Sequence, residues 1–332
     1  DLHSFPTRRS SDLHIVGVAI NGRIQEAQVQ AIYANLSKRI NWAGGISQYP
    51  TFYVEPSEIR DLPNGERQFR TNTRRLVSRN LFGAAWYPLS RFQRIEFGMR
   101  ATNIDDAILT VVEQFEPSTG LLVKDPFLET DYRAGINYVQ PSLALVYDNA
   151  IFRYVGPFLG TRYRLEASQV AGDWNFTQIT ADFRRYIRIA GPVTIASRLL
   201  YFGRIGSQAD QFQAFIGTPD LIRGQTSGSY YSNECGQFAE AGSNTGCFAV
   251  DRLVGEQLGV GNFELRFPVL TPEMRLLPPT IPPIEGAIFY DIGIAYDKGN
   301  TIVWRRQPED DPLNVRAPLQ SWGVSLRTNL LG

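Results

Sequence analysis

The sequence predicts an all-β protein, an antiparallel transmembrane β-barrel, and two observations support this prediction. First, apolar and polar residues alternate along most of the chain in spans of about ten residues, the length that a tilted strand needs to cross a bilayer. Around Asp291, for example, Ile288, Tyr290 and Ile292 fall on one face of a strand, and Asp291 and Gly293 fall on the other. Second, 12% of the residues are aromatic, which suits the interfacial girdles of such barrels.

The first thirteen residues are set apart from the predicted barrel. Residues 1–13 (DLHSFPTRRSSDL) have neither the apolar core nor the cleavage site of a signal peptide. They resemble the in-frame translation of a sequencing adapter joined to a gene fragment, and the alternative is a disordered polar tail. The barrel is therefore expected over residues 14–332.

The strands of the first half are predicted from weak alternation, with one strong run. In that run, Arg91–Thr102, outward Phe97 and Met99 alternate with inward Glu96 and Arg100. The weaker runs of this half are Ile15–Ile20, Glu26–Leu36, Arg39–Ser47, Ala107–Phe115 and Tyr138–Asp148. The carboxylate groups Asp105-Asp106 and Glu309-Asp310-Asp311 could do acid–base work or bind calcium, but their loop-like surroundings favour plain solvation.

The strands of the second half show stronger alternation. They are Pro157–Val170, Asn175–Ile189, Val193–Ile205, Gly261–Val269, the strand around Asp291, and Ser321–Leu330, which gives roughly a dozen strands in all. Arg185 interrupts an apolar face. We expect it toward the turn Ala190-Gly191-Pro192, because an outward Arg at mid-bilayer costs about 2–4 kcal/mol.

The polar face and one long connection describe the expected lumen. Polar-face residues include Arg and Glu in rows, which suits a wet lumen braced by ion pairs. Residues 206–255 form a connection far longer than the usual 2–6 residues. Loops of this size are usually functional or folded against their own domain, so we expect this loop inside the lumen.

Three motifs occur in a characteristic order. Leu221-Ile222-Arg223-Gly224 lies in the long loop, Gly261–Pro268 (GNFELRFP) lies on the next strand, and Phe289-Tyr290-Asp291-Ile292-Gly293 lies on the strand after it. Together they resemble the bacterial surface antigen barrels of the BamA/TamA superfamily, whose signature is an Arg-Gly tetrapeptide at the tip of a lumen loop and an F-x-D-x-G strand motif. The resemblance is strongest from about Phe158 to Gly332. Gln225 departs from it, because the family usually has an aromatic residue there.

The resemblance implies a fold, a location and a role. Such barrels have sixteen strands, lie in the bacterial outer membrane behind periplasmic domains, and insert or translocate proteins. This chain stops where the family's third-last strand would end, so we read it as a fragment, incomplete at the C-terminal and the N-terminal end. The implied partners are outer-membrane lipid, client or passenger polypeptides, and periplasmic domains, with a β-propeller as one candidate.

The motifs also imply a site. Arg223 at the loop tip is expected to reach into the lumen and pair with Asp291, with Glu264 on the preceding strand as its second partner. Gly224, Phe289 and Gly293 complete the matched motifs. The alternative leaves Arg223 solvated and Asp291 bonded to neighbouring lumen arginines. Separately, Cys235 and Cys247 lie in Gly-, Ser- and Asn-rich loop sequence and read as a disulfide in an envelope protein, with a pair of free loop thiols as the alternative.

Composition excludes several functions. Lys plus Arg equals Asp plus Glu at 33 each, so no basic surplus suggests nucleic acid. The two histidines are His3 and His14, so a Ser-His-Asp or Cys-His active site cannot be assembled beyond one terminal His. We expect neither an enzyme nor a cofactor. The function left open beside protein insertion or transport is a passive diffusion channel, or a soluble β-rich binding module with accidental motif matches.

Overall fold

The computed structural model describes residues 14–21, 27–55, 57–153, 155–211, 213–229, 247–271, 282–307, 310–311 and 314–329. Its main strands are β1 (His14–Asn21), β2 (Gln28–Asn35), β3 (Asn41–Val54), β4 (Glu58–Asp61), β5 (Arg67–Pro88), β6 (Gln93–Phe115), β7 (Leu122–Tyr132), β8 (Ile136–Asp148), β9 (Ile151–Phe152), β10 (Pro157–Gly172), β11 (Phe176–Ala190), β12 (Val193–Ile205), β15 (Gln257–Leu270), β16 (Ile284–Tyr296) and β19 (Leu319–Thr328). In the described part of the chain, no helix is both long enough and apolar enough to cross a membrane.

These fifteen strands belong to one sheet. Its hydrogen-bonded order is β1-β2-β3-β5-β6-β8-β10-β11-β12-β15-β16-β19, with β4 beside β5, β7 beside β6 and β9 beside β10. Neighbours along the order are neighbours in the chain, and the paired strands of known register run antiparallel. The all-β antiparallel fold is thus present. β1 and β19 are the two ends of this strand order, and the closure of the sheet into a barrel stays a prediction.

The chain forms two compact units, which are described separately. The first comprises the described residues of 1–87, 97–141 and 170–174, and the second those of 88–96, 142–169 and 175–332. The sequence motifs of the loop, of β15 and of β16 all lie in the second unit.

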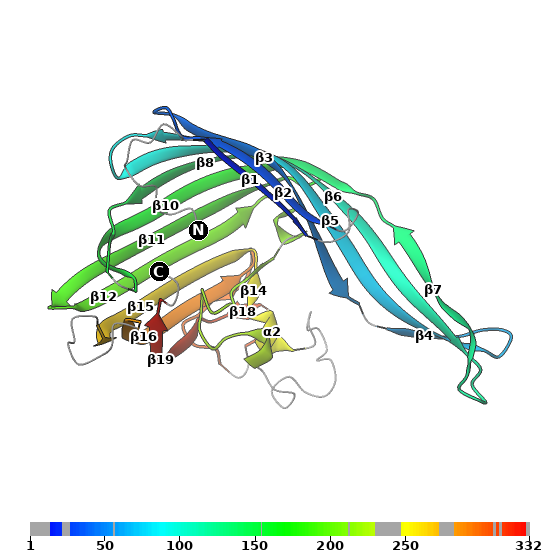
Figure 1. The fold of residues 1–332 in the computed structure, drawn as a ribbon. Coiled ribbons are helices and arrows are strands. Elements are labelled where there is room, and N and C mark those ends of the chain that lie inside the picture. Colours follow the sequence, from blue (N-terminus) through cyan, green and yellow to red (C-terminus); the bar gives the residue numbers. More distant parts are fainter. Residues whose placement is uncertain are drawn as a thin grey trace. The chain divides into compact units, whose positions relative to one another are not determined.

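In the second unit, β11, β12, β15, β16 and β19 lie side by side (Figure 1). Their alternation places the large apolar side chains Leu199, Phe263 and Ile288 on one exposed face. A turn at Gly191-Pro192 joins β11 to β12, and Gly191 has a φ of 50°, a left-handed conformation that glycine adopts without steric cost. Arg185 lies in the half of β11 nearer to this turn, and its guanidinium donates to the Thr161 hydroxyl.

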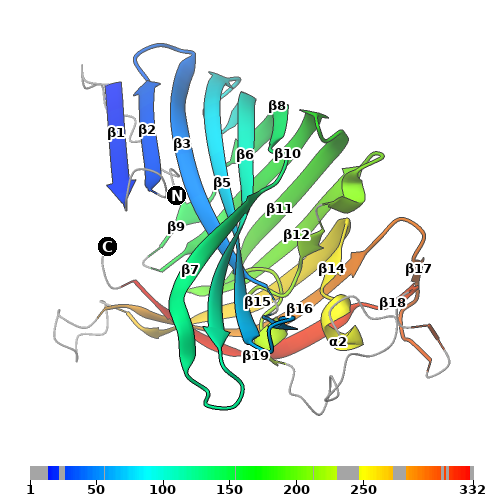
Figure 2. The ribbon, with the colours of Figure 1, turned by 90° about the vertical axis from the view of Figure 1, so that its right-hand side faces the viewer.

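In the first unit, β5 and β6 are long neighbouring strands, of 22 and 23 residues (Figure 2). β4 pairs with β5 over Glu58–Asp61, and β7 pairs with β6 over Leu122–Tyr132. The sequence prediction was wrong here in two respects. The runs Arg91–Thr102 and Ala107–Phe115 are one strand, and the strands β4, β5 and β7 were not predicted.

The junction of those two predicted runs is strand, not loop. Asp105 and Asp106 lie inside β6, where Asp106 is buried and accepts hydrogen bonds from Arg74 at 3.1 and 2.7 Å. The neighbouring Asp105 points to the opposite face, where it lies 3.6 Å from Arg79. The two adjacent aspartates are therefore compatible with a strand, because each has an Arg partner in the neighbouring strand β5.

Ion pairs line the polar face, as the sequence predicted. Arg164 Nη1 lies 2.6 Å from Glu96 and Arg198 Nη2 lies 2.9 Å from Asp182, both in the second unit. Each pair joins residues of different strands. The long loop between β12 and β15 lies against this face.

Candidate functional site

The connection between β12 and β15 has its own small elements. They are η1 (Ala209–Gln211), β13 (Ala214–Phe215), η2 (Ser227–Ser229), α2 (Phe248–Asp251) and β14 (Val254–Gly255). The two ends of the loop meet, because β13 pairs antiparallel with β14 through Ala214 and Gly255, and Phe215 and Val254. The pairing of β13 with β14 at the base of the loop restricts the positions that the loop tip can adopt.

The loop has an apolar core. Ile216, Ile222 and Leu253 of the loop are fully buried. They pack in one cluster with strand residues Leu258 and Val260 of β15, Ala295 of β16 and Leu319 of β19. The expectation of a wet lumen is therefore wrong at this place. Hydrophobic burial contributes to holding the loop, alongside its ion pairs.

The tip of the loop is a tight turn that presents Arg223. The backbone amides of Leu221 and Ile222 both donate to the carbonyl of Thr218, at 2.9 Å each. Gly224 follows with a φ of +77°, a left-handed conformation that a residue with a β-carbon adopts at a steric cost. The turn directs the side chain of Ile222 into the apolar core and that of Arg223 toward β15 and β16.

Arg223 contacts two carboxylates on neighbouring strands. Its Nε and Nη2 donate to Asp291 Oδ2 and Oδ1 at 2.7 and 2.6 Å, a bidentate pair. Its Nη1 donates to Glu264 Oε1 at 2.6 Å, and its backbone amide donates to Asp291 at 3.2 Å. Asp291 is fully buried and Glu264 is 8% exposed. The structure thus brings together the three residues expected to meet, in a drier setting than expected.

The charge of Arg223 is favoured by this arrangement. Burial of the guanidinium acts to lower its pKa, but the hydrogen bonds to Asp291 and Glu264 outweigh burial and raise the pKa above its usual value. Arg223 therefore stays ionised. A buried pair of this kind is sensitive to loss of either partner, because the remaining charge is left without compensation.

Neighbouring side chains fix both carboxylates. Asn262 Nδ2 donates to Asp291 Oδ1 at 2.9 Å and to the Leu221 carbonyl at 2.8 Å, so one amide bridges β15, β16 and the loop tip. Glu264 also accepts from Arg266 at 2.7 Å and from Arg327. Three guanidinium groups therefore surround Glu264, which orients it toward Arg223.

The F-x-D-x-G motif has one function for each of its three positions. Phe289 lies under Arg223, whose Cζ is 3.6 Å from the ring centroid, within the range of a cation–π contact. Asp291 binds the guanidinium. A β-carbon on Gly293 would lie 2.5 Å from Ile222 Cδ1 and 2.8 Å from Ile216 Cδ1, so glycine makes room for the apolar core of the loop. The motif is thus a binding surface for the loop tip.

Two further anchors of the loop were missed by sequence reasoning. Arg198 of β12 donates to the Asp220 carbonyl beside the tip at 2.9 Å, next to a cavity of about 310 Å³ that Arg223 and Glu264 also line. Arg198 also pairs with Asp182 of β11, and no sequence motif connected either residue to the loop.

The second anchor joins the loop to the connection between β16 and β19. Arg316, in β18 (Val315–Arg316), donates from Nη1 to the Asp251 carbonyl at 3.0 Å and from Nε to Asn300 Oδ1 at 3.2 Å. β18 pairs in parallel with β17 (Thr301–Ile302). Burial lowers the pKa of Arg316, and Asp297, 3.6 Å from its Nη2, partly offsets this.

The predicted disulfide lies partly in the described chain. Cys247 is buried, is disulfide-bonded and immediately precedes α2. Cys235 lies outside the described residues, so the pairing of Cys235 with Cys247 stays a prediction. No group of three or more His, Cys, Asp and Glu side chains that could hold a metal ion occurs among the described residues.

Comparisons with known proteins agree with this geometry at the level of fold. The chain is similar to the crystal structure of BamA from Haemophilus ducreyi lacking POTRA domains 1–3, with a TM-score of 0.52 and 12% sequence identity. The match covers 94% of this chain and 62% of that one. The chain thus has a BamA-like fold. No protein-family model and no curated protein sequence matches the chain.

Proposed function

We propose that this chain is part of a bacterial outer-membrane β-barrel of the surface antigen type, closed and sixteen-stranded, which inserts outer-membrane proteins, translocates polypeptides or serves envelope transport. Its proposed partners are membrane lipid, client or passenger polypeptides, and periplasmic domains, of which a β-propeller is one candidate. The proposed role is non-catalytic, and it needs neither cofactor nor nucleic acid.

One observation supports this proposal above the others. Arg223 at the tip of a long loop forms a bidentate pair with fully buried Asp291 in β16 and a third contact with Glu264 in β15. Loop and strand motifs that are far apart in the sequence thus form one site in a chain with a BamA-like fold. An anchored loop of this kind gives a transport barrel a defined resting state.

A passive diffusion channel is the competing function. Such a channel needs a permanently open path, so a loop held against the strands by buried residues is not expected in it. The fully buried Ile216 and Ile222 favour the first proposal, because their burial fixes the loop against β15 and β16. A soluble binding module is disfavoured by the exposed apolar face of the strands, which is much larger than soluble proteins usually leave open.

The test is reconstitution of the full chain in lipid vesicles, followed by addition of a urea-denatured outer-membrane barrel as client. The fraction of client that reaches its folded, heat-modifiable mobility is measured against empty vesicles, and ion conductance is recorded on the same preparation. We expect the wild type to accelerate client folding, and we expect Arg223→Gln to accelerate it less than the wild type does. The matched control is Arg185→Gln, which removes an Arg of β11 that contacts Thr161 instead of the loop.

Two results would overturn the proposal. Steady conductance that is unchanged by Arg223→Gln, without any acceleration of client folding, supports the diffusion channel. Full recovery of the chain in the aqueous phase, with none in the vesicles, supports a soluble module.

A further inference from the structure

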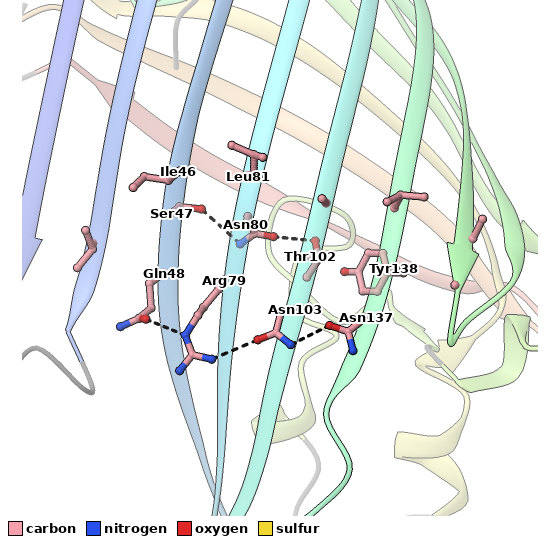
Figure 3. Close-up of a pocket in the computed structure, with 15 residues that line it drawn as sticks. Ile46, Ser47, Gln48, Arg79, Asn80, Leu81, Thr102, Asn103, Asn137 and Tyr138 are labelled. Carbon is pink, nitrogen blue, oxygen red and sulfur yellow. Dashed lines mark hydrogen bonds between the residues drawn. The ribbon is translucent and has the colours of Figure 1, made fainter.

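The first unit has an elongated cavity of about 800 Å³ against strands β3, β5, β6 and β8 (Figure 3). Apolar residues line it, among them Ile46, Leu81, Ala101 and Val139. Ile46 and Leu81 are directly opposite each other on paired strands, so their side chains lie on the same face of the sheet. The cavity is distant in sequence from the loop site, and no motif assigned it a role.

The cavity opens on the apolar face of the sheet. Ile46 is 52% exposed and Leu81 is 62% exposed, so both point away from the packed side. The opposite face is marked by Ser47, which is buried and accepts a hydrogen bond from Asn80 at 3.3 Å. Because successive side chains alternate, Gln48 and Arg79 share the face of Ile46 and Leu81.

One edge of the cavity is a hydrogen-bonded row of polar side chains, one from each strand (Figure 3). Arg79 Nε donates to Gln48 at 3.1 Å and Arg79 Nη1 donates to Asn103 at 3.2 Å. Asn103 in turn donates to Asn137 at 2.8 Å. The apolar wall of the cavity thus ends at this row of polar side chains, the polar border, which contains one guanidinium, that of Arg79.

Arg79 retains donors for a ligand. Its side chain is 48% exposed, and its Nη2 lies 3.6 Å from Asp105, too far for a hydrogen bond. The two bonds to Gln48 and Asn103 hold the guanidinium in place, and Asp105 pairs with it by charge without taking a hydrogen bond from Nη2. A held, half-exposed guanidinium matches phosphate oxygens well, because it presents several N–H groups in a fixed plane.

We propose that this cavity binds one membrane lipid with a phosphate-bearing head group. Its acyl chain lies along Ile46, Leu81 and Val139, and its phosphate accepts hydrogen bonds from Arg79 at the polar border. The chemistry of the lining selects this occupant: the wall offers apolar surface, and the border offers a held guanidinium whose Nη2 lies too far from Asp105 to donate to it. The volume of the cavity is also within the range of small-molecule pockets. The inference depends on the proposed membrane location, but not on protein insertion.

The test uses the full chain in nanodiscs that contain equal amounts of phosphatidylglycerol and a diacylglycerol with the same acyl chains. Lipid that stays bound after release into detergent is counted by native mass spectrometry. We expect the wild type to retain phosphatidylglycerol in preference to diacylglycerol. Arg79→Gln should lower that preference by about tenfold, the loss expected for one charge-assisted hydrogen bond.

Two further variants separate binding from structure. Asp105→Asn removes the carboxylate that lies 3.6 Å from Arg79, and it should raise phosphatidylglycerol retention; a merely structural role for Arg79 gives no such gain. Ala101→Phe narrows the apolar wall and should lower retention of both lipids. Arg185→Gln, which removes an Arg outside the cavity, should change neither.

The proposal is overturned if the wild type retains the two lipids equally, or if Arg79→Gln and Arg185→Gln behave alike. Failure of the chain to enter nanodiscs at all would contradict the membrane location instead. The two failures are therefore distinguishable.

Discussion

Ile222 occupies the space that a side chain on Gly293 would need. A β-carbon built on Gly293 would lie 2.5 Å from Ile222 Cδ1, closer than any such contact in real proteins. The glycine of the strand motif and the apolar residue beside the loop's Arg are therefore one complementary pair. The strand β16 is therefore complementary to the loop in shape as well as in charge.

Gly293→Ala should loosen the loop, because the new methyl group displaces Ile222 from its core. We expect a cost of about 1–3 kcal/mol, typical of overpacking, measured as faster hydrogen exchange of the amides at residues 216–224. Gly259→Ala is the matched control, since a β-carbon there would lie at an ordinary 3.6 Å from Ile294. Adding Ile222→Val, which removes Cδ1, should partly restore protection in Gly293→Ala. Equal exchange in the two alanine variants would contradict the steric pairing.

Arg223→Gln should destabilise the loop more than expected for an ion pair in a wet lumen. The change leaves Asp291 charged, fully buried and without its bidentate partner. The expected loss is about 3–5 kcal/mol of local stability, read from the same exchange experiment. Asp291→Asn added to Arg223→Gln should recover part of it, because the stranded charge disappears. If the two single changes prove fully additive in the double variant, the two residues are not coupled and the anchor lies elsewhere.

Alternation in the sequence predicted the second unit well, and in the first unit it predicted β1 and β2 but not β4, β5 and β7. The predicted runs Pro157–Val170, Asn175–Ile189 and Val193–Ile205 match β10, β11 and β12 within two residues at each end. In β5, by contrast, Arg74 and Arg75 are adjacent, so one charge falls on each face and the period disappears. Arg74 is compatible with a strand because it pairs with Asp106, a contact that the local sequence does not encode.

The candidate site was predicted in part for a similar reason. The resemblance placed Arg223 beside Asp291 and Glu264, because charged motif residues can be matched one by one. The apolar core of Ile216 and Leu253 was not predicted, since apolar residues in an irregular loop have no period. Arg316 was also missed, because it binds a backbone carbonyl, and a carbonyl is the same at every position of the chain.

Arg316→Gln should open the base of the loop and leave its tip anchored. The change removes the charged donors to the Asp251 carbonyl and to Asn300, at a cost of about 1.5–3 kcal/mol, typical of a hydrogen bond from a charged group. Hydrogen exchange should accelerate at residues 251–253 and stay near the wild-type rate at residue 222. Arg305→Gln, at an exposed Arg in the same connection between β16 and β19, serves as the control. Acceleration of equal size at both places would mean that the loop opens as one unit.

The Cys235–Cys247 bridge should make both thiols unreactive in the oxidised protein. Cys247 is buried and its carbonyl accepts from the amides of Val250 and Asp251, so a bridge there would also fix the start of α2. Reduction should destabilise the loop by on the order of 3 kcal/mol under the loop-closure model. The measurement is thiol labelling of unfolded, non-reduced protein: two labelled cysteines would rule the bridge out.

Depth in the membrane should govern the cost of a charge on the outward face of β12. Leu199 lies at the middle of this strand and is exposed, whereas Ile205 is its last residue and equally exposed. For Leu199→Arg we expect a loss of about 2–4 kcal/mol, and for Ile205→Arg about 0–1 kcal/mol, because an interfacial Arg reaches water and a mid-bilayer Arg does not. Urea unfolding of the chain from lipid vesicles measures both. In detergent-free buffer a soluble sheet would show neither cost, since both side chains would already face water. Two equal, small losses in vesicles would therefore contradict a membrane-spanning β12.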